Sequence, residues 1–235
     1  EYGCALTPSP RGTGFNERAT MPPIFVTSSG TEIGKTYVSA MLTRELKARV
    51  IKPLVSGIDE QTFPGSDPAE LLAAMGEAVT FENAGLVSRW RFRAALSPDM
   101  AAKREVRAID FGELVEECVS AAKKHDPLVI EGVGGLMVPL DTRHTVLDWM
   151  KALDAKTGLA PLLVVGAYLG TISHTLTTLA VMRAEGIPPR AIVVSEAAPG
   201  PVPVEETAET IARFAGSVPV RALPRGGTLP LADLF

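Results

Sequence analysis

IFVTSSGTEIGKT, at residues 24–36, is the stretch that decides the fold of this 235-residue chain. Ile24 to Ser28 form an apolar, β-prone run, and residues 35–47 have a helical pattern. Between them, Gly34-Lys35-Thr36 places a glycine, a cation and a hydroxyl at a helix start, as a phosphate-binding loop requires. The strict pattern GxxxxGK[ST] has glycine where this chain has Ser29, so an ordinary strand-to-helix turn is the alternative. The flanking strand and helix favour the phosphate-binding loop.

The rest of the chain alternates short apolar runs with amphipathic segments. Apolar runs predict strands at residues 49–54, 127–132, 161–169, 190–195 and 218–223. Helices are predicted after Asp67-Pro68, after Ser97-Pro98, and over residues 111–124, 173–185 and 205–215. Unbroken Val, Leu and Ile runs are typical of strands covered on both faces, and strands alternating with helices predict parallel pairing. The sequence therefore predicts a single doubly wound α/β domain of P-loop NTPase type over residues 21–235, a mainly parallel sheet flanked by helices.

The composition excludes several classes of protein. Hydrophobic residues make up 46% and charged residues 21%, which is too apolar for a disordered chain. The 23 basic and 27 acidic residues give a formal net charge of −4 without basic runs, so we expect no nucleic-acid partner and no membrane partner. Cys4 and Cys118 are too few for a disulfide scaffold, and the most apolar stretch, residues 159–172, is shorter than the roughly 20 residues of a membrane span. We expect a soluble protein of the cytoplasm.

The first twenty residues, EYGCALTPSPRGTGFNERAT, are set apart from the predicted domain. They begin without Met, contain several Gly, Pro, Ser and Thr, and lack the apolar stretch of a secretory signal. We expect Met21 to be the natural start and residues 1–20 to be a leader that is artificial or wrongly assigned. A genuine flexible N-terminal arm is the alternative.

Charged residues follow two further predicted strands and open a predicted helix. Because the carboxyl ends of parallel strands form the ligand crevice of such sheets, Lys52 and Glu131 are expected to face the phosphate-binding loop. For Lys52 the alternative is a solvated lysine at a sheet edge, and for Asp67 a helix cap instead of a metal ligand. An acid after a buried strand holds magnesium or its water in phosphate-loop enzymes, which favours a functional Glu131 over a turn residue. The loop and these three residues are predicted to converge on one crevice.

These motifs, in this order, resemble the dethiobiotin synthetase family, whose members use ATP to close the ureido ring in biotin synthesis. The family's loop, approximately GTxTxVGKT, is matched at Thr31 and residues 34–36, with Ile33 in place of Val. Its KPxx[ST]G segment is matched by residues 52–57, its SD element by 66–67, its SP element by 97–98 and its EGxGG element by 131–135. The resemblance covers nearly the whole chain after Met21, and it implies an ATP-dependent cyclo-ligase that forms carbon–nitrogen bonds.

The resemblance implies a role for each matched residue. Lys35 is expected on the ATP phosphates, Lys52 between the substrate carbamate and the γ-phosphate, and Thr31 beside the reacting groups. Magnesium, the implied cofactor, is expected to be surrounded by Thr36, Asp67 and Glu131. Nucleotide contacts are expected from Glu32, Ile33, Gly34, Lys35, Thr36, Tyr37, Glu131, Gly132, Val133, Gly134, Ser195 and Pro224. Substrate contacts are expected from Ser56, Lys52, Gly170, Thr171 and Ser173.

The implied substrates are 7,8-diaminononanoate, carbon dioxide and ATP. One amine captures carbon dioxide as a carbamate, a carbamate oxygen attacks the γ-phosphate, and the second amine closes the carbamic–phosphoric anhydride to the cyclic urea. This chemistry needs charge neutralisation and in-line positioning, which two lysines and magnesium supply. His125, His144 and His174 lie outside the matched motifs and are expected to be structural. The resemblance also implies a homodimer, in which a helix N-terminus at residues 170–173 helps to bind the substrate carboxylate.

The chain departs from the family pattern in three places. Ser195-Glu196 stands where the family usually has Asn-Asp, so the contact of an Asn amide with adenine is lost and the nucleobase preference is open. Ser28 replaces the early loop glycine, and the segment between Thr36 and Lys52 is short for the family. None of these departures affects the residues expected to hold magnesium or the carbamate.

Two other functions are the alternatives. A P-loop synthetase of the corrin amidotransferase type carries a glutaminase part with a nucleophilic cysteine, whereas Cys4 lies in the leader and Cys118 in a predicted helix. An ATPase switch for partition or cell-division machinery would need a basic patch or an amphipathic terminal helix, and residues 223–235 predict neither. The synthetase of the dethiobiotin type is therefore favoured.

Overall fold

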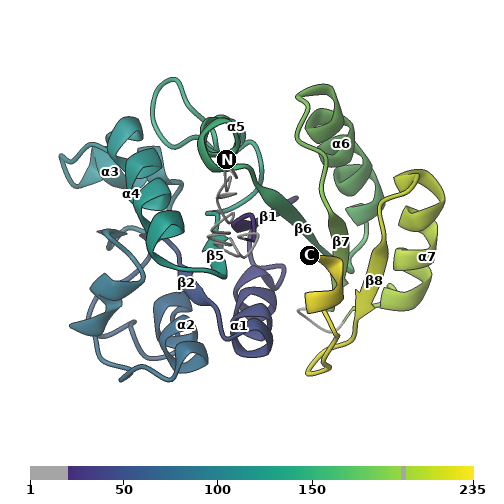
Figure 1. Cartoon of the computed structure of the whole chain (residues 1–235), viewed down its shortest axis with the longest axis horizontal. Helices are drawn as coiled ribbons and strands as arrows, with labels where there is room; N and C mark the ends of the chain where they lie inside the picture. Colours follow the sequence, from purple (N-terminus) through teal and green to yellow (C-terminus); the bar gives the residue numbers. More distant parts are fainter. Residues whose placement is uncertain (1–20, 197–199) are drawn as a thin grey trace, which may run out of the picture.

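A six-stranded parallel sheet crosses the centre of the molecule in the computed structural model, which describes residues 21–196 and 200–235 (Figure 1). The order along the sheet is β2-β5-β1-β6-β7-β8, and every neighbouring pair is parallel. The strands are β1 (Ile24–Ser28), β2 (Arg49–Ile51), β5 (Leu128–Glu131), β6 (Ala160–Gly166), β7 (Ala191–Ser195) and β8 (Val220–Leu223). This confirms the predicted doubly wound parallel sheet. The predicted leader, residues 1–20, lies outside the described residues.

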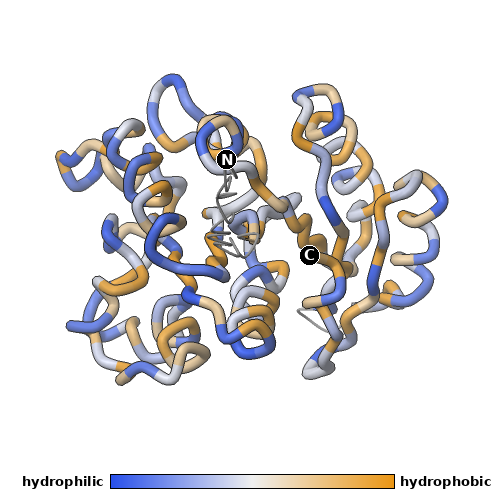
Figure 2. The backbone as a smooth tube through the Cα atoms, viewed as in Figure 1, coloured by the Kyte–Doolittle hydropathy of each residue, from blue (hydrophilic) through white to orange (hydrophobic). Residues whose placement is uncertain are grey.

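Helices cover both faces of the sheet. One face carries α1 (Lys35–Leu46) and α2 (Asp67–Met75), and the other carries α4 (Phe111–Lys124), α5 (Val146–Thr157), α6 (Thr171–Ala184) and α7 (Val204–Ala215). Alternate residues of β1 point to opposite faces of the sheet. Phe25 belongs to the hydrophobic cluster that includes residues of α4 to α7, whereas Ile24 and Val26 belong to the cluster that includes residues of α1 and α2. Figure 2 shows the hydrophobic residues concentrated along the strands and the inner sides of the helices. No helix in residues 21–196 and 200–235 has the length and apolar character to cross a membrane.

The single strand predicted at residues 49–54 is wrong, because the chain forms two strands there in two different sheets. β2 ends at Ile51, and after Lys52-Pro53 the chain forms β3 (Leu54–Ser56), which pairs in parallel with β4 (Trp90–Phe92). Pro53 has no N–H group with which to extend the ladder, and its carbonyl accepts instead from the Trp90 N–H at 2.9 Å. The break leaves Lys52 at the carboxyl edge of the main sheet.

Several elements were not predicted from the sequence, and α5 is the largest of them. Its start is a capping box, in which Thr145 Oγ1 accepts from the Asp148 N–H and the Asp148 carboxylate accepts from the Thr145 N–H. The Thr-x-x-Asp spacing before an apolar run is the signal that could have revealed this helix. The other unpredicted elements are β4 and the short 3₁₀ helices η1 (Asn83–Leu86) and η2 (Ala232–Leu234), whereas α3 (Pro98–Arg104) follows Ser97-Pro98 as predicted.

Candidate functional site

The phosphate-binding loop joins β1 to α1. Gly34 is the N-cap of α1 with φ of 93°, a left-handed conformation that glycine adopts without strain. No side chain caps this helix, and its first turn contains no acidic residue. The first-turn N–H groups and the positive end of the helix dipole are therefore available to an anion, as predicted from the Gly-Lys-Thr motif.

The ammonium group of Lys35 is buried and is held by neutral oxygen atoms. It donates to Ser28 Oγ at 3.0 Å and to the Gly30 carbonyl at 3.1 Å, and within the described part of the chain it forms no ion pair. Burial, together with the nearby positive charge of Lys52, lowers the pKa of Lys35 to about 8. Ser28, which sequence reasoning treated only as a departure from the family pattern, is thus a direct partner of this lysine.

Lys52 lies between two carboxylates. Its Nζ donates to Glu131 Oε1 at 2.7 Å and also to Asp67 Oδ2, and Thr36 Oγ1 donates to the same Glu131 oxygen at 2.8 Å. Burial alone would lower the pKa of Lys52, but Glu131 and Asp67 outweigh it and hold the pKa above its ordinary value. Burial would likewise raise the pKa of Asp67, but Lys52 outweighs it and the pKa is lowered. The predicted convergence of these residues is confirmed, and Lys52 is not a solvated lysine.

Asp67 is the first residue of α2 and not its cap. The cap is Ser66, whose side chain accepts from the Ala69 N–H. Because Ser66 takes this role, the carboxylate of Asp67 faces Lys52 from the first turn of the helix. The alternative of a simple helix cap is wrong for Asp67.

One oxygen of Glu131 lacks a partner. Glu131 ends β5 and is fully buried, and its Oε2 has no hydrogen-bond partner among residues 21–196 and 200–235, whereas Oε1 accepts two hydrogen bonds. A buried carboxylate oxygen of this kind is costly unless it meets a cation or water. Together with the Thr36 hydroxyl and the Asp67 carboxylate, it provides hard oxygen donors of the type that magnesium takes. In the described residues no group of three or more His, Cys, Asp or Glu could hold a metal ion, so phosphate and water oxygens would have to complete the coordination.

Lys35, Thr36, Lys52 and Asp67 line a cavity of about 670 Å³ at the carboxyl edge of the sheet. Most predicted site residues line it, namely Thr31, Glu32, Ile33, Gly34, Lys35, Thr36, Tyr37, Lys52, Ser56, Asp67, Val133 and Gly134. The Ser56 hydroxyl is buried there and has no hydrogen-bond partner in the described part of the chain. Glu70 lines the same cavity and was missed by sequence reasoning; burial and the negative charge of Asp67 raise its pKa. Its place three residues after Asp67, on the same helix face, was the available signal.

Seven predicted site residues do not line this cavity. Glu131 and Gly132 are two of them, although Glu131 is hydrogen-bonded to two lining residues, Lys52 and Thr36. The remaining five come from the β6 to β8 side of the sheet: Gly170, Thr171, Ser173, Ser195 and Pro224. Thr171 is buried, with its hydroxyl donating to the Gly166 carbonyl at 2.6 Å and its N–H to the Tyr168 carbonyl at 3.0 Å. Both donors of Thr171 are therefore engaged within the fold.

The chain is similar to known proteins over most of its length. A family model described as an AAA domain matches residues 23–232. The chain is 46% identical over 225 residues to the ATP-dependent dethiobiotin synthetase BioD of Methylobacterium nodulans, covering 91% of this chain and 98% of that protein. It is also 46% identical over 209 residues to the BioD protein of Acidiphilium cryptum, covering 85% of this chain and 91% of that one.

Solved structures are more distant. A ParA family ATPase from Chlorobium tepidum has a TM-score of 0.48 at 14% identity, covering 87% of this chain and 84% of that chain. The identity to the sequence relatives extends over almost the full length of both proteins. The chain therefore belongs to the family of ATP-dependent dethiobiotin synthetases.

Proposed function

We propose that residues 21–235 form one domain that closes the ureido ring of dethiobiotin from 7,8-diaminononanoate and carbon dioxide, using ATP and magnesium. The observation that carries the proposal is a pair of buried lysines at one cavity, one without a counter-ion in the described residues and one between two carboxylates. The relatives are named for ATP-dependent dethiobiotin synthesis, which supports the same activity here. A reaction that consumes ATP also favours the cytoplasm as its location.

Lys35 is the residue proposed to bind the ATP phosphates. Its charge is buried and is held by neutral oxygens, so an anionic polyphosphate would supply the counter-charge that favours the protonated amine. The free N–H groups at the start of α1 lie beside it and suit phosphate oxygens. The loop residues Glu32, Ile33 and Gly34 are proposed to contact the same phosphates through their backbone.

Magnesium is the proposed cofactor, and Thr36, Asp67 and Glu131 are the residues that would hold it. The unpartnered Oε2 of Glu131 supports this assignment, because a buried carboxylate oxygen requires a cation or a water molecule. When bound, the ion would neutralise charge on the transferring phosphoryl group. Lys52 is ion-paired with Glu131 and Asp67, so the site keeps a positive charge at this position whether or not magnesium is bound.

Lys52 and Ser56 are proposed to receive the carbamate. One substrate amine adds to carbon dioxide and loses a proton, and a carbamate oxygen then displaces ADP from the γ-phosphorus. Lys52 supplies positive charge to both the carbamate and the transferring group, and the unpartnered Ser56 hydroxyl in the cavity wall suits a carbamate oxygen. Thr31, at the exposed side of the same cavity, is proposed to lie beside the reacting groups.

Ring closure is proposed to need no covalent help from the protein. The second amine attacks the carbonyl carbon of the carbamic–phosphoric anhydride, the bond from that carbon to the phosphate oxygen breaks, and the amine loses a proton as phosphate leaves. The protein's task is to hold the amine against the anhydride and to exclude water, which would hydrolyse it. The apolar wall of Val55, Leu96 and Val133 suits the hydrocarbon chain of the substrate.

A homodimer is proposed, with the substrate carboxylate bound at the start of α6. Leu169, just before this helix, is 89% exposed, and Met137 is 56% exposed, so two large apolar side chains are available to a partner subunit. Met137 lines a second cavity of about 320 Å³ together with Thr31 and the side of α6. Because Thr171 is engaged within the fold, the amides of Ile172 and Ser173 are the donors proposed for the carboxylate. Sedimentation equilibrium of the natural protein tests the dimer.

Phosphate release tests the proposed function. A dethiobiotin synthetase should release phosphate from ATP only when 7,8-diaminononanoate and bicarbonate are both present, and mass spectrometry should find one dethiobiotin for each phosphate. Steady phosphate release without the diamine would point to an ATPase switch, and a requirement for glutamine would point to an amidotransferase. Either result would overturn the proposal.

A further inference from the structure

A four-residue turn after β8, Pro224–Gly227, is tied to the first turn of α1. Tyr37, the third residue of α1, donates its phenol hydroxyl to the Gly227 carbonyl at 2.8 Å. The Gly227 N–H closes the turn on the Pro224 carbonyl at 2.9 Å, and Gly226 has φ of 67°, which favours glycine at that place. Tyr37 also lines the 670 Å³ cavity, directly after Lys35 and Thr36. The phosphate-binding helix and this turn are therefore joined through one side chain.

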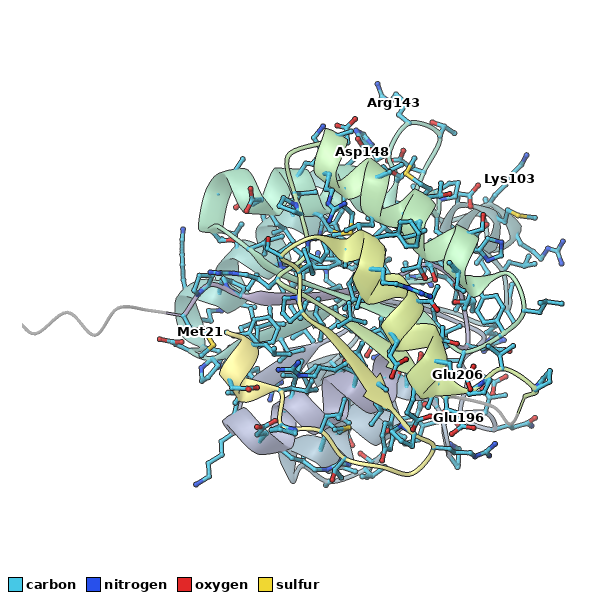
Figure 3. The ribbon with its side chains drawn as sticks, turned by 90° about the vertical axis from the view of Figure 1, so that its right-hand side faces the viewer. Met21, Lys103, Arg143, Asp148, Glu196 and Glu206 are labelled. Carbon is cyan, nitrogen blue, oxygen red and sulfur yellow. The ribbon has the colours of Figure 1, made fainter. Side chains whose placement is uncertain are left out.

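A second residue holds the same turn from the other side. Glu196, directly after β7, accepts the Arg225 N–H on its Oε2 at 3.0 Å and donates its own N–H to the Leu223 carbonyl at 2.9 Å. Figure 3 shows Glu196 beside the tip of β8, where the turn begins. Pro224, Arg225 and Gly226 themselves are exposed. The turn is thus an exposed piece of backbone fixed at both ends by polar side chains.

The distribution of charge around β1 indicates the orientation in which a nucleotide would bind across the strand ends. The groups proposed for phosphoryl transfer, Lys52, Asp67 and Glu131, all lie on the β5 and β2 side of β1. A γ-phosphate facing them directs the rest of the nucleotide along the start of α1 to the other side, over the ends of β6, β7 and β8. The Pro224–Gly227 turn lies on that side, and Tyr37 is the residue of the phosphate-binding helix that reaches it.

We propose that Tyr37 and Glu196 are positioning residues for the nucleoside: they hold the Pro224–Gly227 turn as the wall against which the base of the nucleotide lies. The inference rests on the proposed use of ATP. Neither side chain needs to touch the nucleotide, because each acts on it through the backbone of the turn. A ligand that has the phosphates but no nucleoside gains nothing from this wall.

Calorimetric binding of ATP and of inorganic tripolyphosphate, each with magnesium, separates the two parts of the ligand. We expect Tyr37→Phe, which removes only the hydroxyl, to raise the Kd for ATP by about fivefold, which is typical of losing one hydrogen bond, and to leave the Kd for tripolyphosphate unchanged within about twofold. Glu196→Ala should do the same. Glu196→Gln should retain affinity close to that of the natural protein, because its amide oxygen can still accept from the Arg225 N–H.

Glu45 provides a matched control at the far end of the same C-terminal segment. It lies on α1 and accepts the N–H groups of Leu231 at 3.0 Å and Ala232 at 3.2 Å. If the segment only stabilises the fold, Glu45→Ala and Tyr37→Phe should lower the melting temperature and affect ATP and tripolyphosphate alike. Equal weakening of both ligands by Tyr37→Phe, or no weakening of either, would overturn the inference. A natural protein that makes dethiobiotin but binds ATP no better than tripolyphosphate would overturn it too, while the proposed function would stand.

Discussion

The two sides of the central sheet, divided at β1, carry different kinds of buried polar side chain. On the β5 and β2 side, Lys52 and Glu131 are buried charges, and Lys35 lies beside them at the start of α1. On the β6 to β8 side, the buried polar side chains of the described residues are hydroxyls, namely Thr171, Thr175, Ser195 and Thr207. In the main sheet both sides consist of parallel strands covered by helices. The two sides therefore differ in buried charge although they share this sheet architecture.

The buried charges lie on the side of the sheet at which we propose that phosphoryl transfer takes place. Buried charges cost free energy, and the cost is offset best by an opposite charge. Lys52 is paired with Glu131 and Asp67, whereas Lys35 has only neutral oxygen acceptors, those of Ser28 and Gly30, in the described residues. The buried hydroxyls on the β6 to β8 side carry no charge, so burying them costs less free energy. We expect substitutions there to have smaller effects.

Removing the charge of Lys52 should give the largest effect. We expect Lys52→Ala to lower dethiobiotin synthesis on the order of 10³-fold, because the residue neutralises the transferring group and the carbamate. The variant also leaves the fully buried Glu131 carboxylate without its cation, so the free energy of unfolding should fall by about 3 kcal/mol. Turnover at saturating diamine and denaturant unfolding measure the two effects.

Lys52→Gln separates charge from structure. Its amide can still donate to Glu131 or Asp67, so stability should recover in large part, whereas synthesis should remain lost. Near-normal turnover in either Lys52 variant would remove this lysine from the proposed site.

Substitution of Lys35 should change the free energy of unfolding in the opposite direction. Lys35→Met should abolish ATP binding yet raise the free energy of unfolding at neutral pH, on the order of 1–3 kcal/mol, because burial lowers the pKa of Lys35 to about 8 and the charged form opposes folding. Above pH 8 the folded protein loses this proton, while the unfolded chain keeps it up to the ordinary pKa of 10.5. The free energy of unfolding of the natural protein should therefore rise with pH over that interval, as far as Lys35 determines it. The gain in the free energy of unfolding from Lys35→Met should therefore be smaller at pH 10 than at pH 7, as measured by denaturation curves at both pH values. A destabilised Lys35→Met protein would show that the lysine is compensated after all.

The carboxylates should show a smaller, metal-dependent effect. Glu131→Gln and Asp67→Asn each remove a negative charge at nearly constant shape, so we expect the magnesium midpoint of synthesis to rise by about tenfold with little change in the KM for the diamine. Titration of activity against magnesium at saturating ATP measures the midpoint. Unchanged midpoints in both variants would leave the carboxylates as partners of Lys52 only.

The sequence allowed most of the main sheet to be predicted because β1, β5, β6 and β7 are buried along their whole length and are rich in Val, Leu and Ile. The prediction failed at residues 49–54, where hydrophobicity continues but Pro53 ends the ladder and starts the second sheet. It also missed α5, although the capping box at the start of this helix is a local signal in the sequence.

The convergence of Lys35, Lys52 and Glu131 was predictable, because the carboxyl ends of parallel strands meet at one edge. What could not be predicted depends on contacts between distant segments. The Ser28 hydroxyl that holds Lys35 and the Tyr37 contact with Gly227, 190 positions away, require the folded chain. The lack of an ion-pair partner for Lys35 within the described residues is likewise a property of packing and not of any motif.

The smallest expected effect concerns the nucleobase. Ser195 ends β7 opposite Leu223 of β8, next to the Pro224–Gly227 turn, and is almost fully buried. The phosphate-binding residues cannot distinguish bases, because Lys35 and Thr36 would touch only the polyphosphate. Discrimination must therefore come from the β7 and β8 ends, where this chain offers one hydroxyl instead of an amide with both a donor and an acceptor.

A site built to hydrogen-bond one base rejects an analogue that leaves its polar groups unpaired, whereas a site with fewer such groups rejects it less. We therefore expect the natural protein to use ATP but to accept GTP or CTP within about tenfold in kcat/KM, and Ser195→Asn to widen the preference for ATP by a few-fold. Comparing kcat/KM for the three nucleotides in both proteins measures this, and an unchanged kcat with ATP confirms that the phosphate side is intact. Strict ATP dependence in the natural protein, unaltered by the Asn, would mean that the backbone of the turn reads adenine unaided. The β6 to β8 side would then select the base through its backbone, whereas the charged side would bind only the polyphosphate.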